Sequence, residues 1–297
     1  MPLVSAIMTI RNGEAYLAEA IDSLFAQSLS DIEVVVNDNG STDGTQAILA
    51  GYQDSRLKVL PVDSARQGSF ADGISRAFDH AEGTYVAVLD SDDVAHPRRF
   101  AAQVEFLRSQ PDVGLVGSAM QWIDENGKGT SIYRPEIDPD ALAQEYAWSN
   151  PIPHSSVMYR RDLASRLGGY DTTFKFACDY KLALSILNAG YKVASLPDIL
   201  VRIRQHAGRV TRQDEHSLMR NHDKLELMAS AQSLSFLDAR ARVLGRRELV
   251  KTAVHYARDL VCAGRVHEAR IISRDGRRRD PMYYLLYAGY QALRGNR

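Results

Sequence analysis

Residues 85–93 read YVAVLDSDD, an apolar, strand-like run that stops abruptly in three carboxylates within four positions. Like charges this close destabilise one another unless a cation or a network of hydrogen bonds compensates them. Carboxylate oxygens in a short loop suit Mg²⁺ or Mn²⁺ better than zinc. The stretch therefore predicts a buried strand with a divalent-metal site at its end. The alternative is an ordinary loop in which an Asp caps the next helix.

Around this stretch, short apolar runs with strand character alternate with segments of helical periodicity. Strands are expected at 4–10, 32–36, 57–62 and 85–89, and helices at 14–27 and about 69–81. Alternation of this kind predicts an α/β fold, with a mostly parallel sheet that carries helices on both faces. Such a sheet binds ligands at the carboxyl ends of its strands.

The chain beyond residue 97 continues the pattern and then changes character. We expect a helix at 100–109, a strand at 113–118, a hairpin turn at 124–127, a strand at 155–159, helices at 161–167 and 179–189, and strands at 192–196 and 199–204. From about residue 217 onward the periodicity is helical throughout. We therefore predict one α/β domain over residues 1–210, with halves 1–95 and 96–210, and a helical appendage over residues 211–297.

The overall charge of −1 hides an uneven distribution along the 297 residues. Residues 1–100 hold 7 basic and 15 acidic side chains, whereas residues 240–297 hold 14 basic and 5 acidic ones. Basic helices followed by the aromatic run at 281–290 favour peripheral contact with an anionic membrane; a solvated basic face is the alternative. The two cysteines show no metal-ligand spacing, and no apolar stretch is long enough to span a membrane, so we expect a cytoplasmic protein.

A second polar loop, NDNGSTDGT at residues 37–45, follows the second expected strand. Gly40 permits a tight turn, and the flanking side chains can bind a nucleobase or a ribose. The alternative is a capped turn with only a structural role. Because two polar loops converge at one edge of the sheet, we expect a nucleoside diphosphate held by a divalent metal.

Residues 4–93 resemble the donor half of family 2 glycosyltransferases, which have the GT-A, nucleotide-diphospho-sugar transferase fold. The resemblance rests on TIRN at 9–12, DNGSTDGT at 38–45 and DSDD at 90–93, in the family's order and spacing. It implies a nucleotide-sugar donor and Mg²⁺ or Mn²⁺. The implied donor-binding residues are Thr9, Asn12, Asp38, Asn39, Asp90 and Ser91, and the implied metal ligands are Asp92 and Asp90.

The resemblance extends to about residue 206. The sequence CDY at 178–180 aligns with the family's acidic pair at the start of a helix, which implies that Asp179 is the catalytic base; a structural helix cap is the alternative. The tail RIRQH at 202–206 implies that Arg204 binds the donor diphosphate and that His206 adds a metal bond. His154 falls near the acceptor side; otherwise it is a loop histidine.

Two departures from the family pattern affect the implied roles. Asn39 stands where the family carries a second Asp, which leaves UDP only weakly favoured over dTDP or GDP as the donor nucleotide. Cys178 replaces the usual Glu beside the base, and we expect a buried structural thiol there. The processive members' Gln-x-x-Arg-Trp motif is missing from the sequence, so we expect transfer of a single sugar.

We therefore expect an inverting, metal-dependent glycosyltransferase that acts on a glycan or lipid-linked acceptor, with no nucleic-acid partner. One rival is a haloacid-dehalogenase-like phosphatase with Asp90 as nucleophile, but its later pair of acidic metal ligands is missing. A nucleotidyltransferase would need a Gly-rich basic loop near residue 10, which is also missing. A non-catalytic glycan-binding relative would be expected to lose Asp92 or Asp179, and both are present.

Overall fold

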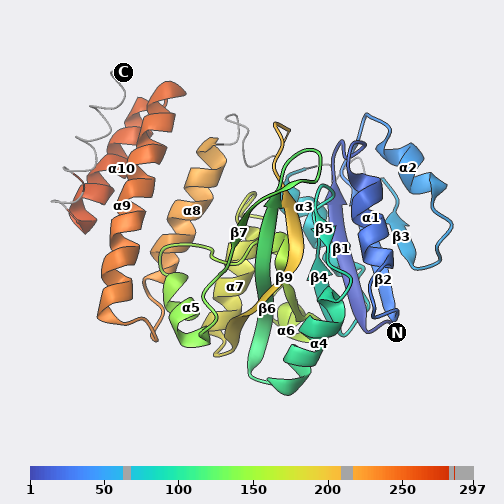
Figure 1. Ribbon diagram of the computed structural model, residues 1–297. Helices are drawn as coiled ribbons and strands as arrows, with labels where there is room; N and C mark the ends of the chain where they lie inside the picture. Colours follow the sequence, from blue (N-terminus) through green and yellow to red (C-terminus); the bar gives the residue numbers. More distant parts are fainter. Residues whose placement is uncertain (63–67, 209–216, 281–283, 285–297) are drawn as a thin grey trace. The chain divides into compact units, whose positions relative to one another are not determined.

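The computed structural model describes residues 1–62, 68–208, 217–280 and 284 (Figure 1). The chain divides into two compact units. Unit 1 comprises residues 1–142 and 151–207, and unit 2 comprises residues 143–150 and 208–297.

Unit 1 is built on one nine-stranded sheet with the order β3-β2-β1-β4-β8-β6-β9-β5, and β7 pairs with β6. The strands are β1 (Val4–Ile10), β2 (Ile32–Asp38), β3 (Leu57–Leu60), β4 (Tyr85–Val88), β5 (Val94–Ala95), β6 (Val113–Ile123), β7 (Gly129–Tyr133), β8 (Met158–Arg160) and β9 (Lys192–Arg204). The first four strands are mutually parallel, whereas β8 runs antiparallel to both β4 and β6. The expected α/β sheet is confirmed, and its antiparallel pairs arise in the second half of the unit.

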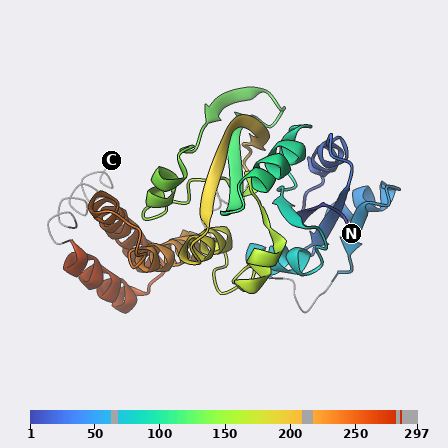
Figure 2. The ribbon, with the colours of Figure 1, turned by 90° about the horizontal axis from the view of Figure 1, so that it is seen from below.

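Helices cover both faces of this sheet, with α1 and α4 on one side and α3, α6 and α7 on the other (Figure 2). The helices of unit 1 are α1 (Leu17–Phe25), α2 (Thr45–Gly51), α3 (Phe70–Asp79), α4 (Arg99–Ser109), α6 (Arg161–Arg166) and α7 (Cys178–Asn188), with a 3₁₀ turn, η2 (His154–Ser156). A further helix, α5 (Pro139–Glu145), crosses the boundary between the units.

Strands β1, β2 and β4 are buried on both faces, which is why their sequences are continuous apolar runs. Their aliphatic side chains pack from both faces, because a parallel sheet is covered by helices on each side. Val4, Ile7, Val34, Val36 and Val88 are all fully buried. The core of unit 1 therefore extends along these strands and includes residues of α1, α4, β6, β8 and β9.

Several boundaries differ from the sequence-based expectation: β6 extends to Ile123, and the strand expected at 155–159 is replaced by the turn η2 and the short strand β8. Two further differences have a clear physical reason. Helix α1 begins at Leu17 rather than at residue 14, because Tyr16 has a non-helical backbone, with φ at −131° and ψ at −11°, and so separates the preceding turn from the helix. The two strands expected at 192–196 and 199–204 form the single strand β9. Its register against β6 jumps between residues 196 and 199, so Pro197, which lacks an N–H donor, lies in a bulge.

Unit 2 is helical, as the periodicity predicts. It contains α8 (Ser217–Ala231), α9 (Ala239–Cys262) and α10 (Val266–Arg279). The segment 143–150 joins these helices through Gln144, whose amide nitrogen donates to the carbonyl of Phe236, and through Gln232, which donates to the carbonyl of Ala147. Among the described residues, no helix is both long and apolar enough to cross a membrane.

Candidate active site

The predicted polar loops meet at the carboxyl edge of β1, β2 and β4. The loop after β1 is laced to the loop after β2 by side-chain bonds to backbone groups. Asn12, at φ 57°, accepts from the N–H of Thr42, and its own N–H donates to Ser41. Glu14 accepts from the N–H of Gly44. These bonds join residues 12–14 and 41–44 into one rim at the carboxyl ends of β1 and β2. The side chain of Asn12 stays exposed.

Asp38 and Asn39 lie in this rim, and both are buried. The Asp38 carboxylate accepts from the N–H of Ser41 and from the side-chain amide of Gln46. The amide group of Asn39 accepts from the N–H of Gly68 at 3.2 Å and donates to the Gly68 carbonyl at 3.0 Å. Both side chains therefore stabilise the loops that follow β2 and precede α3.

Asn39 is thus paired with Gly68 through both ends of its amide. The pairing determines which atom of the side chain is oxygen, since Gly68 presents one donor and one acceptor. An Asp at this position has no N–H to donate. Asn in place of the family's Asp at residue 39 therefore supplies the N–H group that the Gly68 carbonyl, just before α3, accepts.

The floor of the rim is formed by the end of β1 and by α3. Thr9 is half-buried, and its hydroxyl accepts from the amide of Asn37 at 3.4 Å. Gly73 of α3 packs so closely that a Cβ atom there would lie 2.1 Å from the Thr9 oxygen. Ser91 lies beside Gly13, where a Cβ would approach its hydroxyl to 3.4 Å. The donor residues implied by the resemblance thus gather around one rim.

Three carboxylates follow β4, and their oxygens lie within 4.8 Å of one another. Asp90 and Asp92 are half-buried, whereas Asp93 is completely buried. Asp93 accepts from the N–H of Arg204 at 2.9 Å. Burial lowers the pKa of Arg99 to about 9, and the negative charge of Asp93 opposes that shift. Asp93 therefore anchors the loop from behind, and Asp90 and Asp92 remain at its accessible side.

His206 lies against this acidic loop. Its Nε2 atom is 2.9 Å from Oδ2 of Asp92, and its ring packs on Tyr16 with centroids 5.0 Å apart. Residues 92 and 206 are thus brought together although 114 positions separate them in the chain. Two of the predicted metal ligands therefore lie side by side, in direct contact.

Arg204 is placed differently from the phosphate-binding role that the resemblance implies. Its side chain is only 2% exposed. The guanidinium group donates to the carbonyls of Asp92, Asp124 and Glu125 and to the carboxylate of Glu19. It also lies 4.5 Å above the ring of Tyr16. All its nitrogen atoms are used in these contacts, which favours a positioning role for the acidic loop over direct contact with a diphosphate.

The predicted acceptor side contains His154 and Asp179. The Nε2 atom of His154 lies 2.9 Å from the hydroxyl of Tyr170, which also receives a bond from Tyr159 at 3.2 Å. Burial raises the pKa of Tyr170 well above its usual value, and nearby negative groups, Asp179 among them, add to the shift. This tyrosine stays neutral and can hold His154 in place.

Asp179 lies half-buried in the first turn of α7, where the helix dipole favours a carboxylate. The neighbouring Cys178 is completely buried, as a structural thiol would be. Sequence reasoning assigned no role to Tyr170, although it lies within the GGYD segment at 168–171. It also missed Glu19 and Arg99, whose contacts arise only in the folded chain.

The sequence is similar to a known protein family and to several of its members. The family model described as Glycosyl transferase family 2 matches residues 5–168. EpsE of Bacillus subtilis (strain 168), a protein assigned to the glycosyltransferases, is 31% identical and covers 69% of this chain and 73% of its own length. The amylovoran biosynthesis glycosyltransferase AmsE of Erwinia amylovora is 27% identical over 71% of this chain and 79% of its own.

Solved structures show the same fold at lower identity. TarS (residues 1–349) of S. aureus, in complex with UDP-GlcNAc, has a TM-score of 0.69, 17% identity and coverage of 99% of this chain and 92% of its own. The mannosyltransferase PcManGT from Pyrobaculum calidifontis, in complex with GDP-Man and Mn²⁺, has a TM-score of 0.63, 22% identity and coverage of 98% and 84%. With more than half of the sequence matched by the family model, the chain belongs to glycosyl transferase family 2.

Proposed function

We propose that this glycosyltransferase moves one sugar from a nucleotide-sugar to an acceptor hydroxyl, with inversion at the anomeric carbon and with the help of a divalent metal. The observation that carries the proposal is the contact of His206 with Asp92, beside Asp90, at the carboxyl edge of the sheet. Among proteins of this fold, TarS was solved in complex with UDP-GlcNAc, and PcManGT in complex with GDP-Man and Mn²⁺.

The donor set at this edge suits Mg²⁺ or Mn²⁺. Asp90 and Asp92 offer carboxylate oxygens, which are the ligands that these ions prefer, and His206 would add one imidazole nitrogen. All three side chains are half-buried, so a bound ion would keep open positions for phosphate oxygens. When bound, the ion would supply positive charge to the departing diphosphate.

In the proposed reaction, the acceptor oxygen attacks the anomeric carbon as the bond to the diphosphate breaks. Asp179 takes the proton of the attacking hydroxyl, and the diphosphate leaves with the bonding electrons. A single displacement of this kind inverts the configuration. The exposed amide of Asn12 and the side chains of Thr9 and Ser91 line the rim that would receive the nucleotide.

The acceptor is proposed to be a glycan or a lipid-linked glycan. His154, held by Tyr170, would orient the acceptor hydroxyl. A lipid-linked acceptor would be met at a membrane surface, which suits a C-terminal region with 14 basic and 5 acidic side chains. The phosphatase and the non-catalytic relative lose ground, since the chain belongs to a transferase family and retains both Asp92 and Asp179.

A panel of nucleotide-sugars tests the proposal. With Mn²⁺ present, one member should raise the melting temperature of the wild-type protein and be slowly hydrolysed, and chelation should abolish both effects. Asp92→Ala should lose the metal-dependent stabilisation, because the phosphate charge is then poorly compensated. Glu105→Ala, an exposed acidic residue of α4, serves as the control. Equal stabilisation of wild type and Asp92→Ala would refute the metal site, and a phospho-aspartyl adduct on Asp90 would establish the phosphatase instead.

A further inference from the structure

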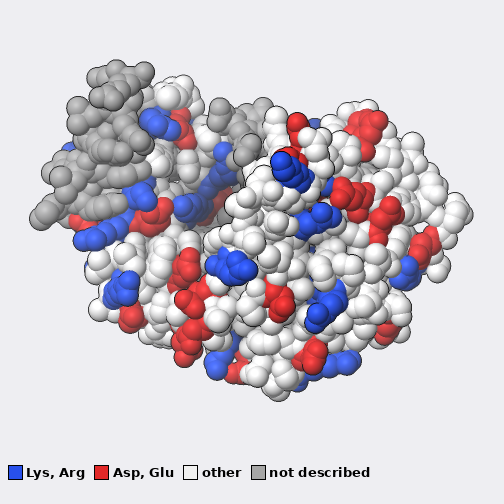
Figure 3. Space-filling view, viewed as in Figure 1, with Lys and Arg blue, Asp and Glu red and all other residues white. Residues whose placement is uncertain are grey.

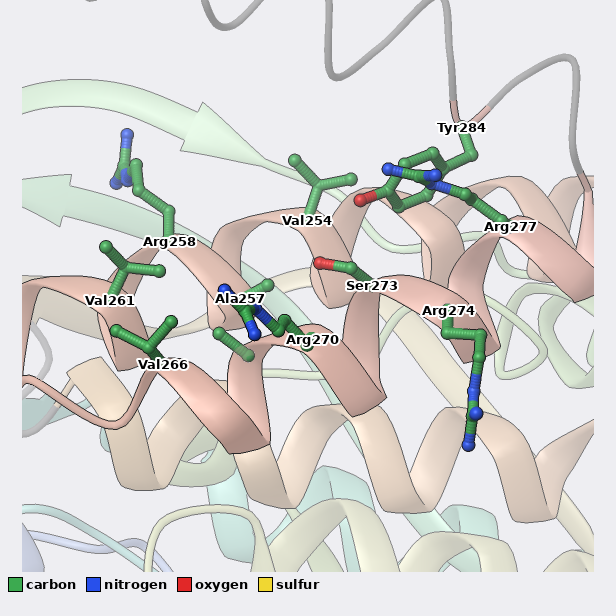
Figure 4. Close-up of a pocket in the computed structure, with 11 residues that line it drawn as sticks. Val254, Ala257, Arg258, Val261, Val266, Arg270, Ser273, Arg274, Arg277 and Tyr284 are labelled. Carbon is green, nitrogen blue, oxygen red and sulfur yellow. The ribbon is translucent and has the colours of Figure 1, made fainter.

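Unit 2 contains a groove between α9 and α10 with a volume of about 550 Å³ (Figure 4). Its apolar part includes Val254, Ala257, Val261 and Val266. Val261 is 52% exposed and Val266 is 44% exposed, although a soluble helix pair usually buries its facing aliphatic side chains. The groove therefore presents apolar surface to whatever meets this side of the two helices.

Arginines surround the apolar part of the groove. Arg258 comes from α9, and Arg270, Arg274 and Arg277 come from α10. Helix α10 carries five arginines against two acidic residues. Residues 240–297 as a whole have a strong basic excess, in contrast to the acidic side chains that gather over α1 and α2 of unit 1 (Figure 3).

The arginines in and around the groove differ in their acidic partners. Arg258 lies 3.6 Å from Asp259, Arg265 is paired with Glu268, and Arg279 is paired with Asp275. Arg270 and Arg274 have no acidic or carbonyl partner among the residues that the structure describes, and both are exposed. Two guanidinium groups next to apolar surface are thus available to an anionic ligand.

The arrangement of these side chains indicates what kind of anion they suit. In Figure 4, Arg270 lies over the middle of the groove and Arg277 lies alongside the ring of Tyr284, 5.2 Å from its centroid, while Arg258 and Arg274 extend away from each other. A pocket for one phosphate would need guanidinium groups that converge on a point. Groups that spread over an apolar surface suit many phosphates side by side, as on a lipid bilayer.

We propose that the α9–α10 groove is a docking surface for an anionic phospholipid membrane. Its arginines contact headgroup phosphates, and Val261 and Val266 face the boundary between headgroups and acyl chains. The proposal extends the membrane-side acceptor suggested above, but it depends on neither the sugar nor the chemistry of transfer. It assigns the membrane contact to particular residues of unit 2.

Vesicle binding of the full-length protein tests the proposal. Wild type should bind vesicles that contain phosphatidylglycerol and should bind pure phosphatidylcholine vesicles much less. Arg270→Glu with Arg274→Glu should weaken binding to the anionic vesicles by at least about thirtyfold, since each arginine near such a surface contributes about fivefold and the new carboxylates add repulsion. The matched control is Arg108→Glu with Arg166→Glu, two exposed arginines of unit 1 with the same change of charge.

The outcomes separate this proposal from its rivals. Equal losses in the two double variants would show that only net charge matters and would overturn it. Competition by soluble glycerol phosphate at the headgroup concentration would identify a free phosphate site and would also overturn it. Val261→Asn with Val266→Asn should weaken vesicle binding, and the loss relative to wild type should be larger at high salt, where charge is screened. Metal-dependent donor stabilisation should be unchanged in every one of these variants, so a failure of the proposed function would be seen separately.

Discussion

At the scale of single residues, Asn39 shows how one atom can decide a local structure. Asn39→Asp would turn a donor toward the carbonyl of Gly68 into a carboxylate that repels it. We expect a loss of about 1–3 kcal/mol in the free energy of unfolding and weaker donor binding, measured by urea unfolding and calorimetry. The loss should shrink as the pH falls and the new carboxyl group takes up a proton. Asn188→Asp, at an exposed helix end, is the control.

Asn39→Asp with wild-type stability at neutral pH would contradict the paired amide. That result would favour direct contact of residue 39 with a nucleobase instead. The pH series distinguishes the two interpretations, because only a residue paired with Gly68 should recover stability on acidification.

The role of Asp179 is also decided at this scale. Asp179→Asn should keep donor affinity, since an amide suits the first turn of a helix about as well as a carboxylate. Transfer should fall by about 10²–10⁴-fold, the usual contribution of a positioned base. Cys178→Ala, which removes a buried thiol beside it, should cost less than about tenfold in rate. Turnover near wild type in Asp179→Asn, or a product that retains the donor's configuration, would refute the inverting mechanism.

Residue types and spacing foretold which side chains gather at the rim, but they could not foretell how each is used. Asp90 and Asp92 are equivalent to Asp93 in the sequence, yet only Asp93 is enclosed by Arg204 and Arg99. The sequence alone suggests that Arg204 binds phosphate, whereas the structure shows its guanidinium group bonded to Asp92, Glu125 and Glu19. Such assignments depend on contacts between residues about a hundred positions apart, which no local pattern records.

At the scale of elements, the closeness of α3 to β1 sets the floor of the donor site. By helix propensity, Gly73→Ala should stabilise α3 by about 0.5–1 kcal/mol. The added Cβ would lie 2.1 Å from the hydroxyl oxygen of Thr9, so we expect a net loss of about 1–3 kcal/mol instead. Thermal unfolding measures the difference.

Gly51→Ala gives the matched control for α3. Gly51 ends α2, and a Cβ atom added there would have no neighbouring atom within 4 Å, so the substitution should raise stability slightly. If both substitutions stabilise the protein alike, α3 does not pack on Thr9 as described.

Element types were easier to predict from sequence than element partners. The strands β1, β2 and β4 follow from their apolar runs, and the periodicity of α8, α9 and α10 is plain. The short strand β5 was not expected, and the antiparallel placement of β8 between β4 and β6 is invisible in the sequence of three residues that forms it. Strand order depends on long-range pairing, which local periodicity does not encode.

At the scale of the whole molecule, acid sensitivity can be traced to a buried carboxylate in the sheet. Glu33 is ion-paired with Lys58 and accepts from Ser5 and from the N–H of Glu82. Burial alone would raise its pKa, but the bonds from Lys58, Ser5 and Glu82 lower it overall. Since the pKa is lower in the folded than in the unfolded protein, Glu33 stabilises the fold above about pH 4.3. That contribution is lost as the pH falls through the folded-state pKa.

Glu33→Gln should therefore lower stability at pH 7 by about 1–3 kcal/mol, and the gap to wild type should narrow on acidification. Urea unfolding at several pH values measures the gap. Glu105→Gln, on the exposed side of α4, should show little effect at any pH. A gap that stays constant between pH 7 and pH 3 would mean that Glu33 does not titrate as its contacts imply.

The buried guanidinium of Arg204 also has a consequence for how the protein is made. It connects the acidic loop at 90–93, the turn at 124–125 and Glu19, and it is itself supplied by the last strand of unit 1. During synthesis, the acidic loop leaves the ribosome more than a hundred residues before the side chain that holds it. A nascent chain that ends before residue 204 would therefore expose an unneutralised acidic loop. The proposed metal site can be completed only after the last strand of unit 1 has emerged.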